Sequence, residues 1–105
     1  MKWTEGDRVL ANRSLDAYWY PSTIQKIEQN RYFVLYDDGD REFLDESKIR
    51  PLDIKIGVKV LARKDGEHLY YKGTITKKKL DAYFIKYDHD EEWLPISMLC
   101  IPKLD

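Results

Sequence analysis

Aromatic and acidic side chains are the residues of this sequence whose types and spacing could carry chemistry. The chain of 105 residues contains eight tyrosines, three tryptophans and three phenylalanines. Residues 37–46 read DDGDREFLDE and contain six acids and one base. Aromatic faces attract cations, and a nearby carboxylate complements the positive charge. These residues could therefore bind a cationic ligand, and the acidic segment would steer a basic peptide toward it in a salt-dependent manner.

The sequence has no motif for other kinds of chemistry. The single cysteine, Cys100, excludes an internal disulfide and a CxxC metal pair. His68 and His89 are separated in sequence and form no zinc-ligand pattern with it. The acidic turns lack EF-hand spacing, and neither a nucleophile motif nor a glycine-rich phosphate loop occurs. We therefore expect no enzymatic activity, no cofactor and no metal.

The formal net charge of −1 differs from the basic excess that is typical of nucleic-acid-binding domains. No apolar run approaches the roughly 20 residues of a membrane span. The N-terminus lacks a signal-peptide pattern, and the lack of disulfides is typical of a reducing compartment. These features predict a soluble, intracellular protein that does not bind membranes.

The sequence repeats itself with an offset of 51 residues. Residues 9–11 (VLA) recur as residues 60–62, and residues 32–33 (YF) recur as residues 83–84. One residue is dropped near Gly39, after which Glu42, Leu44 and Ser47 match Glu92, Leu94 and Ser97. A register kept over about 45 residues indicates an internal duplication.

Each copy is expected to form five short β-strands. Runs rich in Tyr, Thr and Ile favour strands, and no ten-residue stretch shows a helical period. The predicted strands are 8–13, 18–28, 32–36 and 41–44 in the first copy, and 59–64, 69–78, 83–87 and 91–94 in the second. A 3₁₀ turn at 47–49 or 97–99 precedes a short last strand. Lys86 replaces Leu35 of the first copy, which predicts that Tyr83, Ile85 and Tyr87 point inward.

The duplication predicts an all-β chain with one strongly bent, SH3-like barrel at residues 1–52 and another at residues 53–105. Residues 50–56 are too few and too apolar for a flexible tether. We therefore expect the barrels to pack together through this linker, with Leu52, Ile54 and Ile56 between them. One fused ten-stranded sheet with swapped strands is the alternative architecture.

The best-matched segments of the two copies also carry a family resemblance. They are residues 6–11 (GDRVLA), 18–21 (YWYP), 32–40 (YFVLYDDGD) and 49–52 (IRPL), then 57–63 (GVKVLAR), 70–75 (YYKGTI) and 83–88 (YFIKYD). Both copies resemble Tudor domains of the Tudor/Agenet group, over essentially the whole chain. The resemblance implies two five-stranded Tudor barrels in tandem. It also implies a chromatin-associated, nuclear reader of methylated lysine or arginine in histone tails or other basic peptides.

In the Tudor pattern, the ligand mouth lies between the loop after the first strand and the turn between the third and fourth strands. The resemblance implies a mouth in the first copy made by Tyr20, Tyr36, Asp38 and Asp40, rimmed by Tyr18 or Trp19 and closed by Phe43. In the second copy it implies Tyr71, Tyr87 and His89, with Tyr70 and Trp93 nearby. Arg13 and Arg63 stand where many methyl-lysine readers have an aromatic residue. The first copy, which has more acids, is the predicted main site of a monomeric binding module.

Two alternatives of other classes remain open. The first is nucleic-acid binding through Lys72, Lys77, Lys78 and Lys79, with aromatic side chains as stacking platforms. The second is a protein-interaction scaffold in which both mouths are vestigial. Tyrosines of such small barrels also serve as core residues, which is the expectation for Tyr32 and Tyr83.

Overall fold

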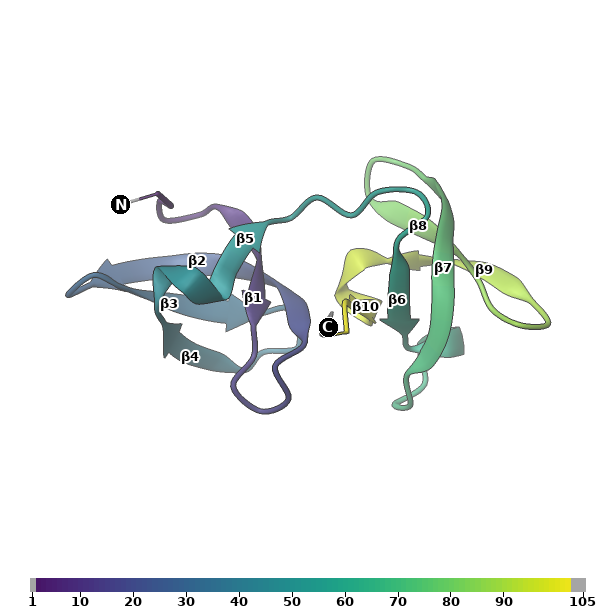
Figure 1. Ribbon diagram of the computed structural model, residues 1–105, viewed down its shortest axis with the longest axis horizontal. Helices are drawn as coiled ribbons and strands as arrows, with labels where there is room; N and C mark the ends of the chain where they lie inside the picture. The colour runs from purple at the N-terminus through teal and green to yellow at the C-terminus, as the bar shows by residue number, and fades with distance from the viewer. Residues whose placement is uncertain (1, 103–105) are drawn as a thin grey trace. The chain divides into compact units, whose positions relative to one another are not determined.

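The computed structural model describes residues 2–102, which form two separate five-stranded sheets (Figure 1). The first sheet contains β1 (Arg8–Asn12), β2 (Trp19–Glu28), β3 (Arg31–Tyr36), β4 (Arg41–Leu44) and β5 (Ile49–Pro51). The second contains β6 (Lys59–Ala62), β7 (Tyr71–Lys78), β8 (Ala82–Lys86), β9 (Glu91–Pro95) and β10 (Leu99–Cys100). The chain divides into two compact units, Met1–Leu52 and Asp53–Asp105.

The predicted all-β fold is confirmed. The described residues contain three 3₁₀ turns, at Glu46–Lys48, Lys64–Gly66 and Ile96–Met98, and no α-helix. The turn at Lys64–Gly66 is not predicted by the sequence, and the other two begin one residue earlier than expected. The two sheets share no strand, so the alternative of one fused ten-stranded sheet is wrong.

Both sheets have the same antiparallel topology. The strand orders are β4-β3-β2-β1-β5 and β9-β8-β7-β6-β10. A bulge shifts the register of β2 between Ile24 and Lys26, and β7 has the equivalent bulge between Ile75 and Lys77. A β-bulge bends its strand and increases the local twist. The bend curls each sheet, which allows the last short strand to pair with the first.

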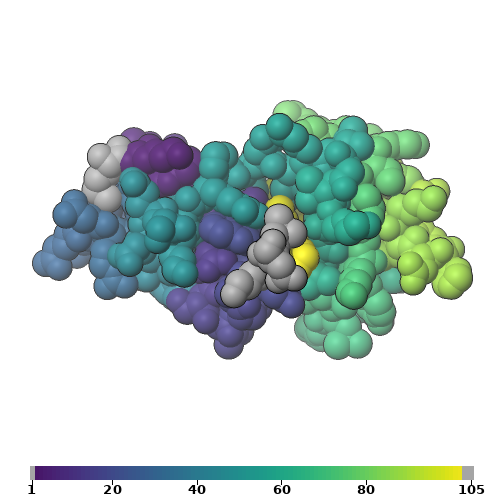
Figure 2. Space-filling view, viewed as in Figure 1, coloured from purple at the N-terminus to yellow at the C-terminus, as the bar shows by residue number. Residues whose placement is uncertain are grey.

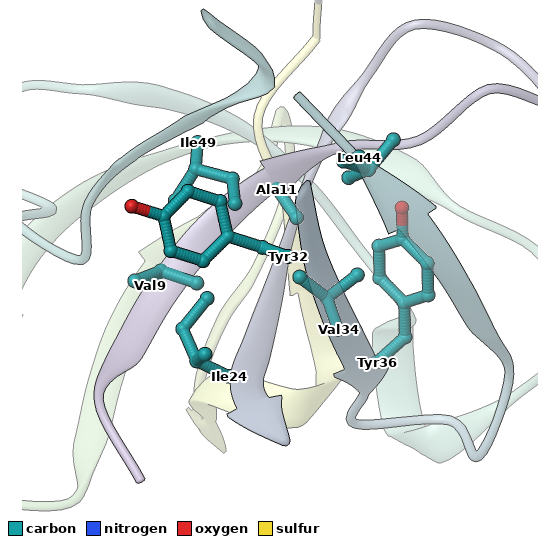
Figure 3. Close-up of a cluster of buried hydrophobic side chains, with 8 residues drawn as sticks. All are labelled: Val9, Ala11, Ile24, Tyr32, Val34, Tyr36, Leu44 and Ile49. Atoms are coloured by element: carbon teal, nitrogen blue, oxygen red, sulfur yellow. The ribbon is translucent and has the colours of Figure 1, made fainter. Parts of the chain in front are cut away.

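The core of each unit comes from alternate residues of its strands. In the first unit, all five strands contribute to a buried cluster (Figure 3), which consists of Val9, Ala11, Ile24, Tyr32, Val34, Tyr36, Leu44 and Ile49. Tyr32 and Tyr36 lie at opposite ends of this cluster in Figure 3. The buried set of the second unit includes Val60, Ala62, Ile75, Ile85, Tyr87, Leu94 and Leu99. Ile85 and Tyr87 therefore point inward as predicted, whereas Tyr83 is only half-buried.

Two of the apolar linker residues differ in burial. Ile54 is buried, and the side chain of Ile56 is exposed. Ile56 lies in a tight turn before β6, in which the amide of Val58 donates to the carbonyl of Lys55 at 3.2 Å and Gly57 has a φ of 96°. This turn directs the side chain of Ile56 to the surface.

Gly73, in the middle of β7, is expected not to tolerate a side chain. A Cβ atom there would lie 2.4 Å from Cγ2 of Ile85 and 3.3 Å from the carbonyl oxygen of Lys86. Because Ile85 is buried in the core, Gly73→Ala should lower the free energy of unfolding by about 1–3 kcal/mol through overpacking. Urea denaturation followed by circular dichroism would measure this loss, and unchanged stability would show that the strands can separate at this point.

Candidate functional site

A cation of the protein itself fills the mouth of the first barrel. Arg13 follows β1, Tyr20 lies in β2 and Tyr36 ends β3. The guanidinium carbon of Arg13 lies 4.8 Å from the ring centre of Tyr20 and 4.6 Å from that of Tyr36. The two rings meet edge to face, with centres 6.1 Å apart and planes at 83°. These distances are those of cation–π contacts, so the two tyrosines already hold a positive charge.

The turn between β3 and β4 supplies the carboxylates that neutralise this charge. Nη1 of Arg13 donates to Oδ2 of Asp38 at 2.8 Å, and Nη2 donates to Asp40. Burial lowers the pKa of the Arg13 guanidinium, but the hydrogen bonds and charges of the two aspartates more than offset this effect and raise the pKa. The side chain of Arg13 is only 8% exposed. Arg13 is therefore fixed in the mouth as an internal ligand.

Glu42, on β4, connects the walls of this mouth. It accepts hydrogen bonds from the Tyr36 hydroxyl at 2.5 Å and from the Ser14 hydroxyl at 2.6 Å. Burial, and then the hydrogen bond to Glu42, raise the pKa of Tyr36 well above its ordinary value. The Tyr20 hydroxyl donates to Asp16 at 2.6 Å. The loop that carries Arg13 is thus attached to β2, β3 and β4.

The second barrel repeats this arrangement with Lys64 in place of Arg13. Nζ of Lys64 lies 5.9 Å from the ring centre of Tyr71 and 5.4 Å from that of Tyr87, and it pairs with Asp90 at 2.9 Å. Glu92 accepts from the Tyr87 hydroxyl at 2.7 Å and from the Asp65 amide at 2.9 Å. A cavity of about 320 Å³ opens here, lined by Lys64, Tyr71, Lys72, Tyr87, Asp88 and His89. The β8–β9 turn beside it lies at the surface (Figure 2).

The two mouths differ in how firmly each internal cation is held. The side chain of Lys64 is 29% exposed and pairs with one carboxylate, whereas Arg13 pairs with two. His89 occupies the repeat position of Asp38, which explains the missing second partner. Hydrogen bonding to Asp90, partly opposed by desolvation, raises the pKa of Lys64, so this side chain stays charged. The second mouth therefore has the more accessible aromatic surface, since Tyr71 is 40% exposed and its counterpart Tyr20 is half-buried.

The structure brings together four of the predicted site residues of the first copy and separates two others from them. Tyr20, Tyr36, Asp38 and Asp40 surround one point, as the distances to Arg13 show. Phe43 contacts Phe33 on the outer face of the sheet, with ring centres 4.7 Å apart. The ring of Trp19 lies 4.1 Å from the guanidinium of Arg50 in β5. Alternation along the strands explains both positions. Leu44 points into the core, so Phe43 points outward, and Ile49 points into the core, so Arg50 and the Trp19 ring that it contacts lie on the outer face.

Phe43 therefore does not close the mouth, and Trp19 does not rim it. Trp93 likewise lies away from the second mouth, because it contacts Phe84 on the outer face of the second sheet, with ring centres 5.0 Å apart. Tyr18 is half-buried at the end of the mouth loop, where its carbonyl accepts from the amide of Arg13 at 2.9 Å.

Arg63 is not the counterpart of Arg13. Its Nε donates to the carbonyl of Glu67 at 2.9 Å, and the next residue, Lys64, occupies the mouth. The repeat offset of 51 already pairs Arg13 with Lys64, so the sequence contained this signal. Sequence reasoning also missed the role of Glu42 and Glu92, although both copies keep a glutamate at this position.

The ion pairs of the first mouth predict a loss of stability in acid. Burial raises the pKa of Asp38, but hydrogen bonds from Arg13 and from the Asp40 amide leave it below its ordinary value. Burial likewise raises the pKa of Glu42, and hydrogen bonds from Ser14 and Tyr36 leave it lowered. A carboxyl whose pKa is lowered on folding stabilises the fold at any pH above its pKa in the unfolded state, which is about 4. This contribution is lost as the pH falls through the lower pKa of the folded state.

The unfolding free energy should therefore be constant from about pH 7 to about pH 5 and should decrease below that. Urea denaturation at a series of pH values would measure this change. The double variant Asp38→Asn, Glu42→Gln should be less stable at neutral pH and show a flatter acid limb. An acid limb of unchanged steepness would place the responsible carboxyls elsewhere.

Metal-binding groups and membrane-spanning helices are both absent from the described part of the chain. Residues 2–102 contain no group of three or more His, Cys, Asp or Glu side chains that could hold a metal ion. Within the same residues, no helix is both long enough and apolar enough to cross a membrane. Cys100 is buried in β10.

Comparison with known proteins identifies the fold. No protein-family model and no curated protein matches the sequence. Among solved structures, the tandem Tudor domains of Crb2 match with a TM-score of 0.67 and 21% identity, covering 92% of this chain and 84% of that chain. The tandem Agenet domains 3–4 of ADCP1 match with a TM-score of 0.42 and 16% identity, covering 93% of this chain and 79% of that one. The match to Crb2 shows that the chain has the tandem Tudor fold, with two SH3-like barrels, and the fold prediction is confirmed.

Proposed function

We propose that the chain is a non-catalytic binding module that takes a methylated lysine or arginine of a basic peptide in the mouth of its second barrel. One observation carries the proposal: in each barrel, two tyrosine rings and at least one carboxylate surround a cation. A methylated ammonium keeps its charge but has fewer hydrogen-bond donors, so aromatic faces suit it better than they suit Lys64. A histone tail is the expected ligand, and chromatin in the nucleus is the corresponding location.

The second mouth is the proposed site because its internal cation is the easier one to displace. Exposed ion pairs contribute about 0–1 kcal/mol, and the lysine stem can swing its ammonium into water. Displacement of Arg13 would instead have to break two ion pairs and two cation–π contacts of a nearly buried side chain. The proposal thus reverses the sequence-based preference for the first copy.

Charge around the second mouth favours a basic partner. The cavity is bordered by Asp88, and Asp90 faces Lys64 from the same turn. Residues 88–92 read DHDEE, with four acids and one histidine. These acids would attract a basic peptide and weaken its binding at high salt. When the ligand displaces Lys64, Asp90 becomes free to pair with the incoming cation.

Titration of the chain with matched peptides tests the proposal. The peptides share one basic sequence and differ only in one lysine, which is unmodified or mono-, di- or trimethylated, or in one arginine, which is unmodified or methylated. Amide chemical shifts should respond to a methylated form more strongly, at Tyr71, Tyr87 and the β8–β9 turn. Equal affinity for modified and unmodified peptides would overturn the proposal, as would shifts confined to the first barrel.

Removing the internal competitor gives the same experiment a second readout. Lys64→Ala should strengthen binding of the methylated peptide by about 2- to 10-fold, because no ion pair or cation–π contact then has to break. Arg63→Ala is the matched control, since it removes a neighbouring cation that lies outside the mouth. If Lys64→Ala weakened binding, Lys64 would be part of the binding surface rather than a competitor.

A further inference from the structure

The outer face of the second sheet carries an exposed aromatic pair that the proposed mouth does not use. Phe84 on β8 and Trp93 on β9 are cross-strand partners with ring centres 5.0 Å apart and planes at 45°. They point outward because their neighbours Ile85 and Leu94 are buried. Trp93 is 38% exposed, so part of its indole ring is accessible to a ligand.

Lysines surround this aromatic pair. We call the surface formed by Phe84, Trp93, Lys77 and Lys79 the Trp93 platform. Nζ of Lys77 lies 5.1 Å from the ring centre of Phe84, and Nζ of Lys79 lies 4.4 Å from that of Trp93. Lys86 extends from the same face of β8, two residues after Phe84. Within residues 2–102, none of these three lysines forms an ion pair, although Glu91 is the cross-strand partner of Lys86.

The first barrel has the same arrangement in a neutralised form. Phe33 and Phe43 pair with ring centres 4.7 Å apart, and Lys26 lies over both rings. There, Lys26 pairs with Glu28 at 2.7 Å. The repeat offset of 51 places Lys79 where the first copy has Glu28. The second copy therefore replaces the neutralising acid by another base and the smaller Phe43 by tryptophan.

We propose that the Trp93 platform binds single-stranded nucleic acid, with a base stacked on Trp93 and phosphates paired with Lys77 and Lys79. Stacking on an exposed aromatic ring flanked by cations is the physical basis of sequence-tolerant single-strand binding. Lys79 needs only to turn from the indole to a phosphate, which exposes the ring face for a base. An acidic peptide would satisfy the lysines but would leave the indole unused.

Two other lysines of the predicted basic set lie outside the Trp93 platform. Lys78 donates from Nζ to the carbonyl of Ile54 at 3.4 Å, and Lys72 lines the second mouth. Neither belongs to the Trp93 platform, so the predicted basic set of Lys72, Lys77, Lys78 and Lys79 does not act as one group. The acids of the β8–β9 turn lie at the far end of β8 and would repel phosphates. A strand should therefore lie across the end of the sheet near the β7–β8 turn.

Fluorescence anisotropy with a labelled single strand of about 12 mixed-sequence nucleotides tests this proposal. The full chain should bind it, and about two phosphate contacts should reduce affinity roughly 7-fold between about 50 and 200 mM salt. Trp93→Ala should weaken binding by about 5- to 100-fold, the range of base–aromatic stacking. Lys77→Gln and Lys79→Gln should each reduce the logarithmic salt slope by about 0.7.

Matched variants of the first barrel serve as controls. Phe43→Ala and Lys26→Gln change the equivalent, neutralised pair and should leave oligonucleotide binding unchanged. Trp93→Phe restores the residue of the first copy and should retain part of the affinity, which separates stacking from a folding defect. The proposal is overturned if no binding occurs at about 50 mM salt, if Trp93→Ala binds normally, or if polyglutamate competes as well as unlabelled oligonucleotide.

Discussion

Replacement of Arg13 by alanine is expected to lower the free energy of unfolding of the first barrel by about 2–4 kcal/mol. Arg13 is nearly buried, pairs with Asp38 and Asp40, and stacks on two tyrosine rings. The variant would leave two carboxylates of one turn facing each other without their cation. It would also uncover the ring of Tyr36, which is otherwise buried. Such losses exceed those of an exposed ion pair because Arg13 itself is nearly buried and packs on two rings, whereas the side chains of Asp38 and Asp40 are 44% and 74% exposed.

Urea denaturation of the full chain would measure this effect, with amide exchange assigning it to the first barrel. Arg63→Ala is the matched control, because it removes an arginine with one hydrogen bond to a carbonyl, and should cost about 1 kcal/mol or less. Arg13→Lys keeps the charge but not the two-pronged geometry, so it should fall between the two. If Arg13→Ala and Arg63→Ala cost the same, Arg13 would not be what holds the mouth together.

The fold could be predicted because the duplication presents each strand twice. Val9 and Val60 are apolar at the same position of both copies and are buried, and the change from Leu35 to Lys86 marks the outer face. Alternation then fixes the direction of every other side chain in a strand. The turn that exposes Ile56 was missed because its geometry depends on hydrogen bonds between backbone groups rather than on an apolar pattern.

The candidate site was only partly predictable. Tyr20, Tyr36, Asp38 and Asp40 could be grouped because the resemblance to Tudor domains implies a mouth at these positions, which lie at the ends of neighbouring strands. What fills the space between them could not be predicted, because a long arginine side chain can point into a mouth or into water. Arg13 was interpreted only as standing where many methyl-lysine readers have an aromatic residue, and it is itself the bound cation. The wrong prediction that Phe43 closes the mouth was avoidable. Leu44 points into the core, and adjacent residues of a strand point to opposite faces.

Replacement of Tyr71 by alanine is expected to weaken binding of the methylated peptide by about 30-fold, the equivalent of a desolvated cation–π contact of about 2 kcal/mol. Tyr71 is the better probe of the second mouth because it is 40% exposed, whereas Tyr87 is buried and hydrogen-bonded to Glu92. Loss of the Tyr71 side chain should therefore weaken ligand binding much more than it lowers the stability of the fold. Tyr71→Phe keeps the aromatic face and should bind almost normally. Calorimetric titration of the three proteins would measure these affinities.

Tyr70→Ala is the matched control, because Tyr70 is 38% exposed but does not line the cavity. Equal losses for Tyr70→Ala and Tyr71→Ala would indicate general surface contact instead of a cage. Loss of binding in Tyr71→Phe would mean that the hydroxyl, and not the ring, recognises the ligand. Tyr71→Ala should leave oligonucleotide binding unchanged, since Trp93 lies on the opposite face of the sheet from the mouth. Because each variant removes one activity only, the mouth and the Trp93 platform can be tested independently of each other.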